Sequence, residues 1–535
     1  MSRNGTRERD GRNEEQEDDV NPYVAAGVLA TGLAAVAGGI YWWTRSTQPE
    51  ETPRQPRNTP PTQARAAVAT ASPTSASESD SPSWVGFLAD VVDRMATLSS
   101  ESSNSMLSYQ GGYSGSSSGV QCQGFGGSSP PPNPVLSNLN ALLADIFVRF
   151  VQIKENDFQL HYRVFDRVFQ HLHKMMKEVD PYYRKYSSTV QFAGSHYDNL
   201  RIKKPDEFDM DIIIDMPLNL SAHPSNAAES DIFIEPKAAG FVQLRMGTQF
   251  QKLPMRDGAE WQNNKAAFEW MDDTKYLLRS KFLDWFKGVV NRALNKFEFS
   301  GFQPVYYVDG VPYTIRKSES GPAVTLIIEN NSKGFQLDVD LVPALKFPES
   351  RWPIGPAYRR IPAQCARGDW MVVGKPIKNG IPHDQKRSWR IALHNQEREL
   401  MHNSGNLKQA LRLIKKLRDS LEMTKIASYY IKTIFFWEIV EKNDLTFWQR
   451  NNPAFLFKHM VGKLHAALVN KKIPYFWNKN NNLVEGVDDR VLFQYAAKLV
   501  PLMQVLENPH EYKQVAKYIL TPAEFRDYNA KFLHI

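Results

Sequence analysis

The chain has 535 residues, 42% of them hydrophobic and 12% aromatic, so it is long enough to bury at least one large core and to form two lobes. Its 65 Lys and Arg against 58 Asp and Glu give a net charge of +7, which favours polyanionic partners, although a solvated charged surface has the same composition. The presence of only Cys122 and Cys365 speaks against a disulfide framework, excludes a four-cysteine zinc site and fits a folded part in the cytosol.

The first apolar segment, Tyr23–Trp43, follows an acidic N-terminal segment, residues 1–22. Its 21 residues carry no charge. As a helix they would span about 30 Å, the thickness of a hydrocarbon core. A buried Ala/Gly-rich soluble helix is one alternative, and a cleaved signal peptide is another, although the acidic start lacks the basic lead of such peptides. We therefore expect a retained transmembrane helix.

The flanks of this segment predict its orientation. Four arginines follow it, at positions 45, 54, 57 and 65, whereas the preceding side is net acidic. Because Lys and Arg tend to stay on the cytosolic side, we expect a single-pass membrane protein whose C-terminal part lies in the cytosol. The outer mitochondrial membrane is favoured, and the endoplasmic reticulum is the alternative.

Residues 44–133 are dominated by Ser, Pro, Thr, Gly and Gln. Such a composition buries too little apolar surface to order itself, so we expect a disordered tether. Within it Trp84–Leu98 has apolar residues at helical spacing, which is typical either of a short helix that binds a protein partner or a membrane surface, or of a marginal isolated helix.

Ordered structure is predicted from Pro134 onward. Apolar residues recur at helical spacing in Val135–Ile153, which opens with Ser and Asn as candidate caps, and in Phe165–Val179. Ala323–Asn330 and Phe335–Leu345 have strand patterns separated by a turn-like Asn-Ser-Lys-Gly. The pattern becomes helical from about Arg387. The sequence thus predicts a mixed α/β lobe over residues 134–386 and an α-helical lobe over residues 387–535.

An unusual density of carboxylates marks Gly194–Pro217. In a strand, Glu207, Asp209 and Asp211 would share one face, because alternate side chains point the same way. Such charges repel one another unless a cation neutralises them, and hard divalent ions prefer carboxylate ligands. A second strand could add Asp340, or its neighbour Asp338. The alternative is an edge strand with a solvated acidic face.

Gly194 and Ser195 lie upstream of these acids. A Gly-Ser pair at a strand-to-helix junction lets backbone N–H groups and a hydroxyl approach a phosphate closely. This pair is a weak motif alone. Followed by an acid-x-acid strand and a later strand acid, it matches the arrangement of a metal-dependent nucleotidyl transferase.

The segment Gly194–Pro217 resembles the active-site segment of the Mab-21 family, and especially its cyclic GMP-AMP synthase and cyclic GMP-AMP synthase-like members. The resemblance covers roughly Pro134 to the C-terminus and implies a nucleotidyltransferase core followed by the helical lobe. Further segments that carry it are Gly321–Ile328, Leu337–Leu345, Ser388–Met401, Leu411–Arg418 and Ala427–Trp437.

The resemblance implies a role for each matching residue. Glu207, Asp209 and Asp340 would hold Mg²⁺ or Mn²⁺. For nucleotide binding it implies Ser195 at the phosphate turn, Arg390 at a nucleobase, Lys415 and Ser428 at the triphosphate, and Tyr429 stacked on a base. Without the resemblance, a structural alternative is as well supported as a functional role for each of three residues: a surface charge for Arg390, a solvated helix face for Lys415 and a core aromatic for Tyr429.

The implied function is ligand-activated synthesis of a cyclic dinucleotide from ATP and GTP in innate immune signalling, with double-stranded RNA favoured over DNA as activator. Val342, Ala392 and His394 stand where the synthase has hydroxyl residues, so the base preference stays open. No Cys- and His-rich zinc insertion lies near Met401–Asn406. The alternative is a non-catalytic nucleotide-binding receptor or adaptor of the outer mitochondrial membrane, similar to the mitochondrial dynamics receptors, which share the N-terminal layout.

Overall fold

A computed structural model describes residues 136–194, 200–202, 205–220, 231–256, 258–353, 355–363, 365, 368–377, 380–402 and 404–535. These residues fall in one of two compact units, the one that includes Pro134–Ile535. The predicted transmembrane helix, the tether and Ser195 lie outside the described residues. Within the described part, no helix combines the length and the apolar character that a membrane crossing needs.

The first part of the described chain forms a large mixed sheet. Its strands are β1 (Ser187–Ala193), β2 (Glu207–Ile214), β3 (Ile232–Ala238), β4 (Phe241–Met246), β5 (Glu298–Ser300), β6 (Gln303–Val308), β7 (Val311–Ser320), β8 (Ala323–Asn330), β9 (Phe335–Phe347), β10 (Trp370–Val373) and β11 (Ser388–Ala392).

Strand β9 organises this sheet. The strand order is β3-β4-β11-β10-β9-β8-β7-β6-β5, and β2 pairs with β9 and with β1 outside that path. Along its first half β9 lies between β8, which is antiparallel, and β2, which is parallel; its second half pairs with β10 instead. β9 therefore joins distant parts of the chain, because β2 pairs with one of its edges while β8 and then β10 pair with the other.

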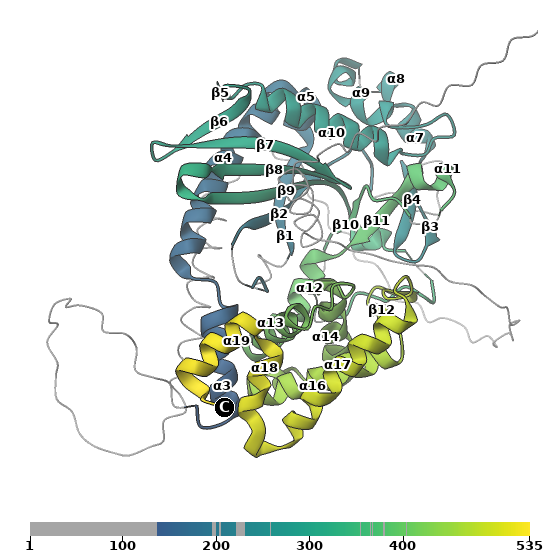
Figure 1. The fold of residues 1–535 in the computed structure, drawn as a ribbon. Coiled ribbons are helices and arrows are strands. Elements are labelled where there is room, and N and C mark those ends of the chain that lie inside the picture. Colours follow the sequence, from purple (N-terminus) through teal and green to yellow (C-terminus); the bar gives the residue numbers. More distant parts are fainter. Residues whose placement is uncertain are drawn as a thin grey trace, which may run out of the picture. The chain divides into compact units, whose positions relative to one another are not determined.

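Helices cover the sheet and connect its strands. They are α4 (Glu155–Val179), α5 (Pro181–Tyr186), α7 (Thr248–Gln251), α8 (Leu253–Arg256), α9 (Trp261–Glu269), α10 (Arg279–Leu294) and α11 (Pro382–Arg387), with 3₁₀ turns η2 (Gly258–Glu260), η3 (Asn331–Lys333) and η4 (Glu349–Arg351). Figure 1 shows α4 running alongside the sheet, where it contacts α10, β6 and β9. The ring of Phe165 on α4 stacks on Phe208 of β2, with 4.7 Å between the ring centroids.

The C-terminal part is mainly helical. It comprises α12 (His394–Leu400), α13 (Gly405–Ser420), α14 (Ser428–Lys442), α15 (Leu445–Arg450), α16 (Pro453–Val469), α17 (Asp489–Glu507), α18 (Ala516–Ile519) and α19 (Pro522–Tyr528), with β12 (Pro474–Tyr475), β13 (Asn478–Asn482), η5 (Pro509–Val515) and η6 (Asn529–Leu533). The N-terminal α3 (Leu139–Ile146) and η1 (Phe147–Val151) pack against α16 and α13 and so belong to this bundle (Figure 1).

Several predicted elements form as expected. Asn138 caps α3, because its side chain accepts a hydrogen bond from the amide of Ala141. β8 spans Ala323–Asn330 as predicted, and Gly334 follows it with φ +60°, which makes the turn into β9. The prediction that helical structure starts near Arg387 is wrong, because Ser388–Ala392 pairs with β10 and β4 as strand β11.

Candidate active site

The predicted carboxylates meet where β2 runs parallel to β9. In the register of these strands Asp209 lies opposite Asp340, and Glu207 lies opposite Asp338. Glu207, Asp209 and Asp340 each offer an oxygen, and these oxygens lie within 4.8 Å of one another. Three carboxylate oxygens this close together could hold a divalent cation.

The alternation of β2 directs these acids to one side of the sheet. Phe208 and Met210 are each 1% exposed and face the core under α4, where the ring of Phe165 stacks on that of Phe208. The intervening Glu207 and Asp209 point to the opposite face. The aromatic packing of one face therefore fixes the direction of the carboxylates on the other.

Desolvation and mutual repulsion raise the pKa values of the central acids. Burial raises the pKa of Asp209 well above its ordinary value, and the charges of Glu207 and Asp340 raise it further. The pKa of Asp340 is also raised, mainly by burial, although Thr325 opposes this by donating a hydrogen bond of 2.5 Å to Oδ1. Since a bound cation would favour the charged carboxylates, this donor set fits a divalent metal.

Gly194 allows the chain to pass directly over Asp209. It has φ +71°, and an added Cβ would lie 1.8 Å from Asp209 Oδ2, too close for any side chain. The adjacent Ala193 pairs with Asp209 across β1 and β2, which explains the approach. The predicted role of its neighbour Ser195 lies outside the described residues and stays a prediction.

Two further acids lie on the same face but outside the group of three. Asp211 is 3% exposed, and its Oδ2 lies 3.2 Å from His394 Nε2 on α12. Burial raises the pKa of Asp211, while His394 and Arg398 oppose the rise. Asp338 accepts a hydrogen bond of 3.2 Å from Gln336. The geometry thus groups Glu207 and Asp209 with Asp340 and places Asp211 against His394 instead.

The predicted nucleobase contacts lie where β11 meets α14. Arg390 is on β11, close enough to Tyr430 and Tyr475 for its charge to lower their pKa values, although burial is the larger effect and raises both. The ring of Tyr429 lies 6.2 Å from that of Tyr475. Tyr429 is 7% exposed and donates a hydrogen bond of 2.6 Å to Glu397. The structure therefore brings Arg390 and Tyr429 into one neighbourhood, and their roles stay predictions.

The two residues predicted at the triphosphate lie on different helices. Lys415 of α13 is 5% exposed, and its Nζ donates a hydrogen bond of 2.6 Å to the carbonyl of Leu200, in the segment that precedes β2. Burial, followed by the charges of Arg418 and Arg201, lowers the pKa of Lys415 to about 7. Ser428 is half-buried at the first turn of α14. The structure thus places Lys415 beside the chain that leads to Glu207.

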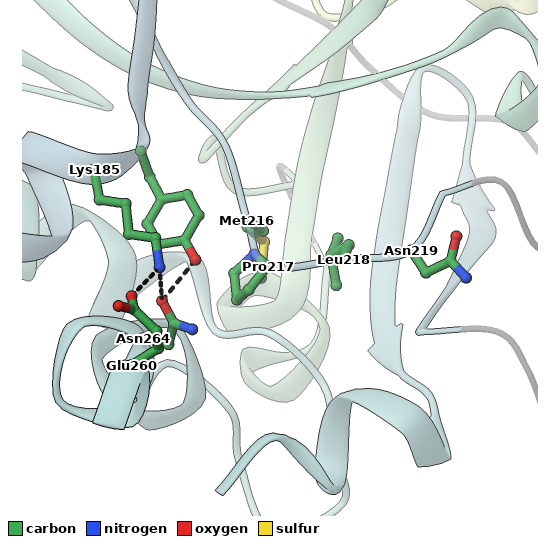
Figure 2. A pocket seen from close by; sticks show the side chains of 8 residues that line it. Lys185, Met216, Pro217, Leu218, Asn219, Glu260 and Asn264 are labelled. Carbon is green, nitrogen blue, oxygen red and sulfur yellow. Dashed lines mark hydrogen bonds and ion pairs between the residues drawn. The ribbon is translucent and has the colours of Figure 1, made fainter. Parts of the chain in front are cut away.

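A separate cavity of about 560 Å³ lies beyond the end of β2, and Figure 2 shows its lining. Lys185 Nζ lies 2.5 Å from the carboxylate of Glu260, and the Tyr186 hydroxyl donates a hydrogen bond of 2.6 Å to Asn264 (Figure 2). None of the predicted site residues that the structure describes lines it. The lining residues are Lys185, Tyr186, Met216, Pro217, Leu218, Asn219, Glu260 and Asn264.

Among the described residues, three side chains at the site were not predicted from the sequence. Thr325 donates to Asp340, Arg201 forms an ion pair with Glu207, and Glu397 accepts hydrogen bonds from Tyr429 and Trp477. Thr325 could have been found from the alignment of two predicted strands, because it lies opposite Asp340 in the β8–β9 pair. The contacts of Arg201 and Glu397 depend on tertiary structure that no local pattern indicates.

Comparison with known families identifies two consecutive regions. Residues 196–403 match the Mab-21 protein nucleotidyltransferase domain. Residues 406–500 match the Mab-21 protein HhH/H2TH-like domain. The first region includes β2, β9 and all three grouped carboxylates, and the second includes α13, α14 and α16.

Similar proteins extend the match to most of the chain. A cyclic GMP-AMP synthase-like receptor of Ctenocephalides felis is 31% identical over 402 residues, which are 74% of this chain and 90% of that protein. The receptor of the same description from Aethina tumida is 30% identical over 392 residues, 73% of this chain and 92% of that protein. That of Tribolium castaneum is 30% identical over 388 residues, 72% and 93% respectively.

Proposed function

This chain belongs to the Mab-21 family and is a nucleotidyltransferase, and from this premise we propose that it is a ligand-activated cyclic dinucleotide synthase of innate immune signalling. Its substrates would be ATP and GTP, and its product would resemble cyclic GMP-AMP. The observation that supports this proposal is the group of Glu207, Asp209 and Asp340, whose oxygens lie within 4.8 Å of one another. The names of the similar proteins support the class of product.

The chain's own residues would prepare the reaction. Glu207, Asp209 and Asp340 would hold Mg²⁺ or Mn²⁺, which when bound lowers the pKa of an attacking hydroxyl and neutralises charge on the leaving pyrophosphate. Thr325 holds Asp340 in place through its hydrogen bond of 2.5 Å. Gly194 leaves the space over Asp209 free of a side chain, so backbone N–H groups there could approach a phosphate. Arg390, Lys415, Ser428 and Tyr429, with Ser195, would bind the nucleotides.

The proposed activator is a double-stranded nucleic acid, and RNA is favoured over DNA. Its support is the kinship with cyclic GMP-AMP synthase-like receptors and the net charge of +7, which favours a polyanion. A further protein partner could bind through the tether, residues 44–133, where Trp84–Leu98 has the pattern of a short amphipathic helix.

We also propose that the segment 23–43 anchors the protein in the outer mitochondrial membrane, with the catalytic domain in the cytosol. The support is the uncharged 21-residue segment and the arginines that follow it. The test is alkaline extraction of membranes from cells that express the full chain or a variant without residues 23–43, together with microscopy against mitochondrial and endoplasmic-reticulum markers. Extraction of the full chain into the soluble fraction would contradict the anchor.

The proposed activity can be tested with the full-length protein in detergent. Labelled ATP and GTP are incubated with Mg²⁺ or Mn²⁺ and with double-stranded RNA, double-stranded DNA or no nucleic acid. We expect the wild-type protein to form a cyclic dinucleotide when RNA is present, and the Asp209→Asn variant to form none. Equal background turnover by both proteins with every nucleic acid would contradict the proposal.

A further inference from the structure

Arg201 holds two of the acids at the head of β2. Its Nη2 lies 2.6 Å from Asp206 Oδ1, and its Nη1 forms an ion pair with Glu207 Oε2. The side chains of Arg201 and Glu207 are 18% and 14% exposed. A guanidinium that bridges two carboxylates makes strong, directional, charge-assisted hydrogen bonds. Glu207, a member of the group of three carboxylates, is therefore already engaged by a cation of the protein.

The backbone next to Arg201 is fixed from the helical bundle. Leu200 is 2% exposed, and its carbonyl accepts a hydrogen bond of 2.6 Å from Lys415 Nζ on α13. Because the hydrogen bond from Lys415 fixes the backbone at Leu200, the adjacent Arg201 starts from a constrained position when it contacts Glu207. The contact therefore has a low entropic cost for forming.

Glu207 is the member of the group that already has a cationic partner. Among the described residues, Asp209 and Asp340 form no ion pair, and the only side chain that donates a hydrogen bond to either is Thr325. A divalent ion at this group needs an oxygen of Glu207, and the guanidinium occupies Oε2. Metal and guanidinium thus require the same carboxylate.

We propose that Arg201 is a built-in competitor of the divalent metal: it neutralises Glu207 in the metal-free protein and must withdraw from Glu207 when the metal binds. This inference rests on the proposed function, because it takes the three carboxylates to be the metal ligands. Arg201 then lowers the intrinsic affinity of the site for metal and stabilises the metal-free state. Asp206, 45% exposed, offers the guanidinium a second carboxylate after its release.

The first test is a titration of the full-length protein with Mn²⁺ alone, in which electron paramagnetic resonance measures free Mn²⁺. Because removal of a positive charge in contact with a ligand strengthens the attraction of a cation, Arg201→Gln should bind Mn²⁺ about tenfold more tightly than the wild type. Arg163→Gln is the matched control, since Arg163 forms an exposed ion pair with Asp309 at 3.2 Å. If Arg201→Gln binds Mn²⁺ no more tightly than the wild type, the proposal that Arg201 competes with the metal is refuted.

The second test measures melting temperature with and without Mn²⁺. Arg201→Gln should melt below the wild type in the absence of metal, because Glu207 loses its partner, and the gap should close at saturating Mn²⁺. A purely structural arginine would leave the same gap in both conditions, which would overturn the proposal. If Arg201→Gln does not fold, Arg201→Lys serves in its place, with a smaller change of the same sign, because a lysine cannot bridge both acids with a planar fork.

The outcome for the proposed function can be separated from this one. If the wild type shows no Mn²⁺ binding that is lost in Asp209→Asn, the proposed metal site is refuted, and the proposed competition by Arg201 is refuted with it. If the wild type binds Mn²⁺ at this site and Arg201→Gln binds it no more tightly, only the competitor is overturned.

Discussion

Buried acids have opposite electrostatic surroundings in the helical bundle and where β2 pairs with β9. In the bundle, Glu438 is 1% exposed and is surrounded by His459 Nε2 at 2.7 Å, Lys463 Nζ at 2.6 Å and Lys442 Nζ at 3.5 Å. Burial raises the pKa of Glu438, but the hydrogen bonds from His459 and Lys463 outweigh it and lower that pKa to about 2. Where β2 pairs with β9, by contrast, the pKa values of Asp209 and Asp340 are raised.

This difference in surroundings distinguishes a charge that stabilises the fold from charges that are available to bind a ligand. Glu438 has its counter-ions within the protein, so its charge contributes to the stability of the fold. Asp209 and Asp340 repel each other without an ion pair among the described residues, which costs stability until a cation arrives. Buried carboxylates therefore have opposite effects on folding in the two regions, and substitutions can test this.

The largest expected effect is on turnover by Asp209→Asn, which keeps the shape of the side chain and removes its charge. We expect the rate to fall by a hundredfold or more, on the order of what loss of a key electrostatic contact costs. The same change should raise the melting temperature of the metal-free protein, because it relieves repulsion with Glu207 and Asp340. Steady-state rates and calorimetry measure the two effects. A lower melting temperature of Asp209→Asn without metal would contradict the inferred repulsion among these carboxylates.

The pH dependence of stability should follow the same logic. The folded-state pKa of Asp209 lies above its ordinary value of 3.8, so the metal-free protein should lose stability as pH rises from that value through the raised pKa. Asp209→Asn should remove this slope, and Mn²⁺ should reverse it, because the metal binds the deprotonated acids. Melting curves recorded from about pH 4 upward provide the measurement.

Glu438→Gln should behave in the opposite sense. It leaves His459, Lys442 and Lys463 without their shared carboxylate, and we expect a loss of about 2–3 kcal/mol in the free energy of unfolding at neutral pH. The folded pKa of about 2 lies below the ordinary 4.5, so the stabilising contribution is complete above 4.5 and is lost as pH falls toward 2. Denaturant unfolding of wild type and variant should therefore converge at low pH. A gap that persists at low pH would contradict the assigned cause.

Gly194→Ala should have a smaller effect that reaches the site. The new Cβ would displace the carboxylate of Asp209, so we expect Mn²⁺ affinity to fall by about tenfold, and the positive φ to cost about 1–2 kcal/mol of stability. Gly321→Ala is the matched control, because Gly321 has φ +59° and its added Cβ would meet nothing within 4 Å. The control should lose similar stability and keep its Mn²⁺ affinity. Equal loss of affinity in both variants would argue against the contact with Asp209.

Thr325→Val should have the smallest effect. It removes the hydrogen bond to Asp340 with little change in shape, and we expect a further rise in the pKa of Asp340 and a few-fold weaker Mn²⁺ affinity, in line with about 1 kcal/mol for one hydrogen bond. The titration used for Arg201→Gln measures it. Unchanged affinity at both low and neutral pH would show that Thr325 does not orient Asp340.

Local patterns predicted the parts of the site that lie within one strand. The alternation of Glu207, Phe208, Asp209 and Met210 is directly visible in the sequence, and so is the extent of β8. Strand patterns left Asp338 and Asp340 as alternatives for a third ligand, and the resemblance selected Asp340, which the long-range pairing of β2 with β9 places opposite Asp209. Strand β11, the last strand of this sheet along the chain, was missed because Ser388–Ala392 is only five residues long and directly precedes a helix. Periodicity does not distinguish so short a strand from the start of the helix. The contacts of Arg201 could not be predicted from the sequence, because they depend on the path of the folded chain.

The central claim is that Glu207, Asp209 and Asp340 form the metal site of a nucleotidyltransferase. The most direct test is anomalous diffraction from crystals of the protein with Mn²⁺ and a non-hydrolysable ATP analogue. We predict an anomalous peak within about 2.2 Å of oxygens from all three carboxylates, adjacent to the phosphates of the analogue. A bound analogue with no Mn²⁺ between these residues, or with its Mn²⁺ held by other groups, would contradict the claim.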